Sequence, residues 1–188
     1  MDELAHAAGQ DPIEARLGIL QDDRFKKVLE VISEKANWKE KLPAGQGRGV
    51  AMFKSFGSIS ACCVTVSKQG DGSVKIDKVV SVIDCGWHVN PDNVKAQTEG
   101  NIVMGLTAAI KPGITYAGGM AQQSNFNDYP IMRINEAPEM EIHIVNSGEV
   151  PGGVGEPGLP PVAPALANAI FAATGKRLRK LPIDLNEV

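Results

Sequence analysis

The sequence has few aromatic residues, few cysteines and no excess of basic charge. Aromatic residues make up 5% of its 188 residues. Lys and Arg together number 19 against 22 Asp and Glu, so the formal net charge is −3 and no general positive field would attract nucleic acid or an anionic membrane. No apolar run approaches the roughly 18 residues that a membrane-spanning helix needs. We therefore expect no nucleic-acid partner and no membrane span.

The cysteines, Cys62, Cys63 and Cys85, do not form a recognisable framework. Their number is odd and two are adjacent, which suits neither a set of disulfides nor a zinc site. The histidines also lack the spacing of metal ligands. We predict reduced, buried thiols that pack as small hydrophobes, and no metal ligated by protein side chains.

Two segments with different apolar periodicity follow each other along the chain. In residues 1–42, apolar side chains such as Val28 and Ile32 recur at helical spacing. Proline and several glycines then indicate a linker over residues 41–49. The sequence thus predicts a small helical segment at 1–42 and a larger domain at 43–188, with 43% hydrophobic residues in the whole chain to form a core.

From about residue 50 the apolar period changes to two, which is typical of strands. The Gln-Gly-Asp-Gly sequence at 69–72 predicts a hairpin turn between a strand around 59–65 and another at 74–83. Further strands are expected near 113–116, 120–125 and 140–145, and long helices from Asn90 and from Val162. The predicted fold class is α+β, with antiparallel β hairpins packed against helices on one side.

Both long helices carry unusually small residues. Gly100 and Gly105 fall inside the first of them, where each glycine costs roughly 1 kcal/mol relative to alanine. They therefore imply close approach of a ligand or of another element. The helix from Val162 to Thr174 has alanines all round and ends at Gly175, so we expect it to be buried and closely approached by its neighbours.

A glycine-rich loop at residues 152–158 presents a single carboxylate, Glu156, just before this last helix. Glycines allow close backbone approach to a ligand, and the prolines that follow stiffen the loop, so the acid is held in one place. A preorganised lone glutamate suits a general base. The alternative is a surface turn that enters a core helix, since glycine and proline clusters are common in turns.

The same loop formally matches the dinucleotide-binding fingerprint through Gly153, Gly155 and Gly158. The neighbouring prolines, however, remove N–H groups that would bind a pyrophosphate, and no βαβ unit with a ribose-binding acid follows. We reject the dinucleotide interpretation on these grounds.

Read as a string, residues 153–170 resemble the end of the large, molybdopterin-binding subunit of the xanthine dehydrogenase and aldehyde oxidase family, and most of all its isoquinoline 1-oxidoreductase branch, in which this subunit is called beta. Other segments resemble the same family in the same order: Asp84-Cys85-Gly86, Asn90-Pro91, Gln97-Thr98-Glu99-Gly100, the stretch 123–130 and the stretch 137–142. Asn101 stands where that family usually has a second glycine.

The resemblance implies roles for particular residues. Glu156 matches the glutamate that lies beside the molybdenum centre and acts as general base, for which a desolvated loop would raise the carboxyl pKa toward neutrality. Gln97 matches a glutamine that hydrogen-bonds the pterin, and the backbone at Gly153, Val154 and Gly155 is expected near the cofactor. The alternatives are a structural salt bridge for Glu156 and an ordinary polar helix position for Gln97.

The resemblance also implies a larger assembly. The chain looks like the C-terminal part of a molybdenum hydroxylase large subunit that oxidises N-heteroaromatic compounds or aldehydes. Its expected cofactor is molybdopterin cytosine dinucleotide with molybdenum, and its expected partners are the rest of the large subunit and a small subunit with [2Fe–2S] clusters. The expected compartment is the cytoplasm, with the periplasm as the alternative.

The chain looks like only the C-terminal part of a large subunit, and this suggests a second, different function. A cofactor that several distant segments bind together is bound weakly by only two of these segments. We therefore expect the isolated chain to contain no cofactor and to be inactive. The alternative function is a structural or interaction domain without catalytic competence. Apolar surface exposed on such a fragment would favour association into a homodimer.

Overall fold

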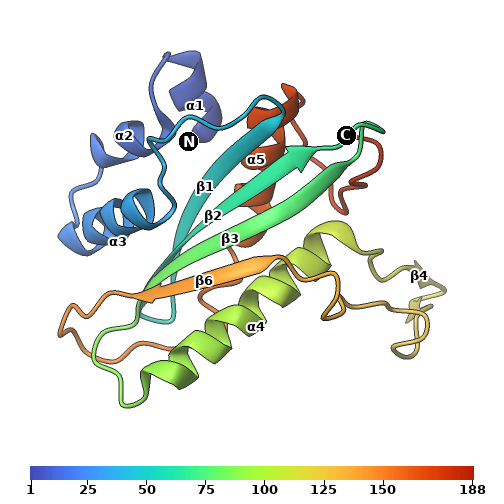
Figure 1. The fold of residues 1–188 in the computed structure, drawn as a ribbon. Helices are drawn as coiled ribbons and strands as arrows, with labels where there is room; N and C mark the ends of the chain where they lie inside the picture. Colours follow the sequence, from blue (N-terminus) through green and yellow to red (C-terminus); the bar gives the residue numbers. More distant parts are fainter.

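A computed structural model describes all residues from Met1 to Val188. A four-stranded sheet lies at the centre of the molecule, and helices pack on both of its faces (Figure 1). The predicted α+β class is confirmed, but the expectation of helices on one side is wrong, because the sheet has an apolar cluster shared with helices on each face. In chain order the elements are α1 (Asp2–Ala7), α2 (Pro12–Leu17), α3 (Asp23–Lys35), β1 (Gln46–Ser55), β2 (Ser58–Lys68), β3 (Val74–Asp84), α4 (Pro91–Ile110), β4 (Tyr116–Ala117), β5 (Met120–Ala121), β6 (Glu139–Ile144) and α5 (Val162–Thr174).

The sheet combines antiparallel and parallel pairing. Strands β1, β2 and β3 are antiparallel neighbours, whereas β6 pairs with β3 in parallel. The expectation of antiparallel strands alone is therefore wrong at β6. Helix α4 and the segment after it carry the chain back to the end at which β3 begins, and strands joined by such a crossover run in the same direction.

Helices α2 and α3 cover one face of the sheet. The starts of both helices are capped, because the side chains of Asp11 and Asp22 accept hydrogen bonds from the first N–H groups of each helix. Buried Arg16 adds a polar link, since its guanidinium donates to the Val50 carbonyl of β1 at 3.4 Å. Residues of both helices and of the sheet share one buried apolar cluster: Ile13, Val28, Leu29, Ile32, Val50, Ile59, Ala61, Cys63, Val80, Val82 and Val145.

Helices α4 and α5 cover the opposite face. Cys62 belongs to the cluster on this side and Cys63 to the cluster on the other, as strand alternation requires. All three cysteines are buried and free, which confirms the expectation of reduced thiols that pack as small hydrophobes. Burial raises the pKa of both neighbouring thiols, that of Cys63 to about 12.

The backbone of α5 lies directly on β1. A Cβ atom at Gly47 or at Gly49 would overlap the α5 backbone around Ala169, so neither strand position accepts a side chain. The linker expected over residues 41–49 is therefore too long, because β1 already begins at Gln46 and both of these glycines are strand residues. We expected α5 to be buried all round. It is buried on the side that faces the sheet, whereas Pro164 and Ala172 are exposed.

Residues 111–138 form an arm that extends from the end of α4 (Figure 1). The two strands expected here are reduced to the short pair β4 and β5. At its base the arm is held by buried Met132, whose N–H donates to Thr107 Oγ1 at 3.1 Å, and by an ion pair between Lys111 and Glu136. Its large apolar side chains remain exposed: Ile114, Tyr116, Met120, Phe126, Ile131 and Ile134. No helix in the structure has the length and apolarity that a membrane crossing requires.

The two interior glycines of α4 have different surroundings. A Cβ at Gly105 would lie 2.8 Å from Val162 Cβ of α5, so this glycine permits close contact between the two helices. A Cβ at Gly100 would meet nothing within 4 Å. At Gly105 the close approach inferred from the sequence is therefore made by α5. At Gly100 no other part of this chain comes close enough to require a glycine.

This contrast yields a stability prediction. We expect Gly105→Ala to destabilise the fold by about 1–3 kcal/mol, because the added methyl group overpacks the contact with Val162. Gly100→Ala in the same helix is the matched control, and it should stabilise the fold by about 1 kcal/mol through helix propensity. Urea unfolding of both variants measures the difference; equal effects at the two positions would contradict the structure.

Candidate functional site

The glycine loop is bonded to two segments that lie far from it in sequence. Gly153 N–H donates to the Phe56 carbonyl at 2.7 Å, and the Ser58 hydroxyl donates to the Gly153 carbonyl at 2.6 Å. Gly152 N–H donates to the carbonyl of Cys85 at 2.8 Å. The β1–β2 turn and the end of β3 therefore hold the first half of the loop.

The second half of the loop packs on α4. A Cβ at Gly158 would lie 3.1 Å from Asn101 Cβ and 3.4 Å from Thr98 Cγ2, so only a glycine allows this contact without displacement. Thr98 follows Gln97 directly in the chain. The structure thus brings the segment that carries Gln97 against the loop that carries Glu156, two segments that sequence alone could relate only by resemblance.

The predicted site residues face outward. Glu156, Gln97 and Gly100 are exposed, and the side chains of Glu156 and Gln97 make no hydrogen bond within the chain. Glu156 also forms no ion pair, so the salt-bridge alternative finds no support. The desolvation expected for Glu156 is not supplied by its own loop and would have to come from something that covers it.

The loop backbone is open at Gly155, whereas a Cβ at Gly153 would lie 2.9 Å from Phe56 Cβ. Gly153 and Gly155 are exposed, and a Cβ at Gly155 would meet nothing within 4 Å. Val154 behaves differently, because its half-buried side chain packs against a small cluster of Ile83, Cys85 and Val94. At this position the backbone, and not the side chain, is therefore free to contact a ligand.

Asn101 is turned into the interior. It is 5% exposed, and its Nδ2 has no hydrogen-bond partner in the chain. Because the side chain lies against Gly158, it does not cover the outer face of α4 that presents Gln97 and Gly100.

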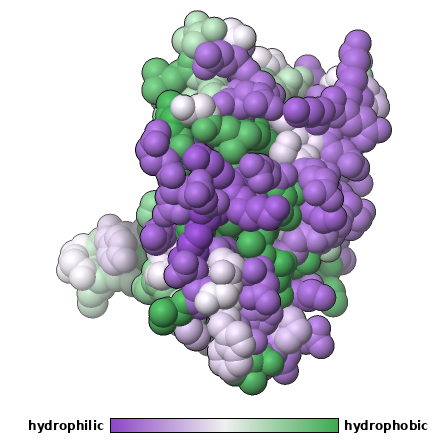
Figure 2. Space-filling view, turned by 90° about the vertical axis from the view of Figure 1, so that its left-hand side faces the viewer, coloured by the Kyte–Doolittle hydropathy of each residue, from purple (hydrophilic) through white to green (hydrophobic).

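A pocket of about 510 Å³ opens beside the loop. None of its lining residues is an acid, a lysine or an arginine. It is lined by Cys85, Trp87, His88, Val89, Asn90, Asn93, Val94, Pro151, Gly152 and Val154. Several large apolar side chains near it are exposed: Phe56, Trp87, Val89 and Val150. On the face shown in Figure 2, hydrophilic residues predominate and apolar residues form separate patches.

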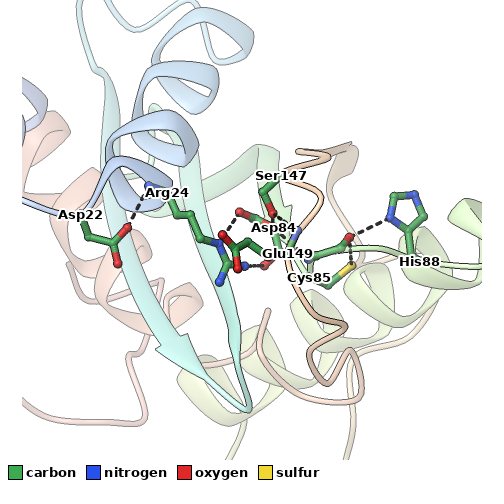
Figure 3. Close-up of polar contacts among 8 residues, drawn as sticks. Asp22, Arg24, Asp84, Cys85, His88, Ser147 and Glu149 are labelled. Atoms are coloured by element: carbon green, nitrogen blue, oxygen red, sulfur yellow. Dashed lines mark hydrogen bonds and ion pairs between the residues drawn. The ribbon is translucent and has the colours of Figure 1, made fainter.

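Sequence reasoning missed the part that Asp84 plays. Its buried carboxylate accepts from Gly86 N–H at 2.9 Å, from the Ser147 hydroxyl at 2.7 Å and from Arg24 Nε at 2.9 Å (Figure 3). The signals in the sequence were the position of Asp84 at the end of a strand and its place in the Asp84-Cys85-Gly86 segment that resembles the family.

The electrostatics of this cluster follow from its hydrogen bonds. Burial by itself would raise the pKa of Asp84, but the donors from Arg24, Gly86 and Ser147 outweigh it and hold the pKa below its ordinary value. The pKa of Arg24 is raised, chiefly by its hydrogen bond to Asp84. The charged forms of both groups are therefore the stable ones in the folded protein.

Comparison with known proteins supplies the family. Residues 2–138 match the family model of the molybdopterin cofactor-binding domain. The chain belongs to this family. The match places it among the molybdopterin-binding domains of the xanthine dehydrogenase family and confirms the resemblance seen in the sequence motifs. Glu156 lies beyond the matched residues.

Curated relatives of this family are much longer than this chain. It is 32% identical to the beta subunit of isoquinoline 1-oxidoreductase of Brevundimonas diminuta, over 97% of the chain and 24% of the relative. It is 33% identical to one of the subunits of nicotinate dehydrogenase of Pseudomonas putida, over 100% of the chain and 17% of the relative. This chain thus spans at most about a quarter of these two relatives.

Solved structures show the same fold. Quinoline 2-oxidoreductase from Pseudomonas putida 86 matches with a TM-score of 0.59 and 19% identity, over 68% of this chain and 17% of that chain. The aldehyde oxidoreductase from Desulfovibrio desulfuricans matches with a TM-score of 0.57 and 26% identity, over 69% of this chain and 15% of that chain.

Features of this chain fit a molybdopterin cofactor at the exposed face. Gln97 offers unpaired amide donors and an acceptor, which suit the edge of a heterocycle. Gly100 and Gly155 leave open space where a side chain would otherwise stand, so a flat group can approach the backbone. No group of three or more His, Cys, Asp or Glu side chains is placed to hold a metal ion.

The lowered pKa of Asp84 gives a prediction for acid stability. A depressed folded-state pKa contributes stability above the unfolded Asp value of about 3.9, and this contribution is lost as the pH falls through the folded value. The difference in unfolding free energy between the wild type and Asp84→Asn should therefore be full at neutral pH and shrink below about pH 4. Urea titrations from pH 7 to pH 3 measure it, and a difference that does not change with pH would contradict this account.

Proposed function

We propose that this chain forms part of the cofactor site of a molybdenum-dependent hydroxylase or dehydrogenase. The single observation that carries the proposal is the packing of the glycine loop against the first half of α4, through Gly158 and Asn101. This contact sets Glu156 and Gln97 on adjoining exposed segments. The family of the chain makes molybdopterin the ligand that these segments would bind.

Each proposed residue has a separate task. The Gln97 amide hydrogen-bonds the pterin edge, and the open space at Gly100 and at Gly155 allows the cofactor to approach the backbone closely, beside Gly153 and Val154. The cofactor, when bound, supplies the two-electron redox chemistry. Glu156 accepts a proton at its carboxylate from the attacking oxygen, which requires a covered site in which the carboxylate is no longer fully hydrated.

The finer identity of the assembly is part of the same proposal. We infer that the cofactor is the cytosine dinucleotide form and that electrons leave through [2Fe–2S] clusters on a partner subunit. Substrates are N-heteroaromatic compounds or aldehydes, in keeping with the names of isoquinoline 1-oxidoreductase and nicotinate dehydrogenase, whose matched chains are themselves subunits. The remaining segments of a large subunit would cover Glu156 and complete the pocket.

The exposed arm favours a second function, that of an interaction domain without catalysis. Residues 112–127 carry no charged side chain, and Tyr116, Met120 and Phe126 within them are exposed. Apolar surface of this kind marks a contact with another protein, either the rest of a subunit or a second copy of the chain. Sedimentation of the isolated chain distinguishes a stable homodimer from a monomer.

The catalytic proposal predicts a separation of binding from turnover. In the complex co-expressed with neighbouring genes, Glu156→Gln should retain molybdenum and pterin but lose about 10²–10⁴-fold in turnover, because the general base is gone. Metal analysis and the rate of substrate oxidation are measured on the same preparation. Full activity of the variant would remove Glu156 from the mechanism.

Gln97 provides the complementary variant. Gln97→Ala should lower the pterin content of the complex, since it removes a hydrogen bond to the cofactor while leaving Glu156 in place. The isolated chain is the control and should contain neither molybdenum nor pterin. If the co-expressed complex also lacks molybdenum, the interaction-domain function remains.

A further inference from the structure

Asp84 joins three parts of the chain at one buried carboxylate. Its side chain is fully buried, with Arg24 of α3 on one oxygen and with Gly86 N–H and the Ser147 hydroxyl on the other (Figure 3). Arg24 also reaches the Asp84 carbonyl at 3.5 Å, and the charge of Glu149 lies near Arg24. Helix α3, the end of β3 and the segment before the glycine loop therefore meet here.

Beyond Asp84 and Ser147, two backbone segments run side by side toward the glycine loop. Trp87 N–H donates to the Glu149 carbonyl at 2.9 Å, and Gly152 N–H returns to the Cys85 carbonyl at 2.8 Å. A Cβ at Gly86 would overlap the backbone of Glu149 and Val150, so the two segments are in direct contact. Any displacement of Ser147 relative to Asp84 is thus passed along residues 149–152 to the loop.

The chemistry of the carboxylate makes it hard to replace. Every group that faces its two oxygens is a donor, namely a guanidinium, a backbone N–H and a hydroxyl. An amide at this position offers one acceptor and one donor. Its NH2 group would therefore point at another hydrogen-bond donor. A buried carboxylate without the arginine would in turn be left with an uncompensated charge.

We propose that Asp84 and Arg24 form a positioning pair that holds the glycine loop against the rest of the site. In this role the N-terminal helical segment, through α3, takes part in the construction of the Glu156 loop, although none of its residues is assigned to the cofactor. The consequence for catalysis rests on the proposed function above; the effect on the loop does not.

The test is hydrogen exchange on the isolated chain. Asp84→Asn should accelerate exchange of the Trp87, Gly152 and Gly153 amides by about tenfold or more relative to the β1–β2 amides, because the carboxylate that joins the two segments is lost. A merely structural role would instead accelerate all slowly exchanging amides together. That uniform result, or unchanged loop amides, would overturn the proposal.

A rescue variant keeps the proposal testable even if the single variant is unstable. Gln places an amide atom at the position of Arg24 Nε, so Arg24→Gln with Asp84→Asn restores a donor–acceptor contact without either charge. The pair should return loop exchange to within about threefold of the wild type, whereas failure to restore it while the fold stays intact counts against positioning. Asp23→Asn is the matched control, since Asp23 pairs only with Lys26 on the same helix, and it should leave the loop unchanged.

The co-expressed complex separates this inference from the proposed function. If the wild-type complex contains molybdenum, Asp84→Asn should lower turnover more than metal content, and the rescue pair should recover both. If the wild-type complex contains none, the cofactor assignment fails, while the exchange experiment on the chain still decides the positioning role.

Discussion

Close contact between the α5 backbone and β1 is the constraint on which the arrangement of this protein depends. It exists because Gly47 and Gly49 carry no side chain where the helix crosses the strand. Once α5 lies there, its N-terminus and the glycine loop before it are directed toward the β1–β2 turn and the first half of α4. A side chain at either glycine would displace the helix and, with it, the loop that carries Glu156.

The candidate site is firmly built on its inner side and open on its outer side. Hydrogen bonds with Ser58, Cys85 and Phe56 hold the loop backbone, and Gly158 locks it to α4. The side chains of Glu156 and Gln97, by contrast, are exposed and make no hydrogen bond within the chain. Such a surface resembles one wall of a pocket. Its side chains can act chemically only when a second wall covers them and excludes water. The exposed apolar arm and the short span of the chain relative to its relatives agree with that character.

The fold could be predicted well where local signals were strong. The start of α4 at Asn90 and the end of α5 at Gly175 are as predicted, because capping acts over a few neighbouring residues. The prediction was wrong at β6, whose parallel pairing depends on the path of a distant crossover, and at β1, whose glycines resemble a linker. Cys62 and Cys63 lie on opposite faces of the sheet because strand geometry alone determines the alternation.

Sequence by itself determined the family, the class of fold and the identity of the loop with Glu156, because ordered motifs and local periodicity are properties of the chain as written. Only the tertiary structure decided that Gly105 meets α5 while Gly100 meets nothing, that Asn101 turns inward, and that Asp84 is bonded to Arg24 and Ser147. These facts depend on contacts between residues far apart in sequence. No pattern of neighbouring residues specifies such contacts, since they are set by how the sheet and helices pack together.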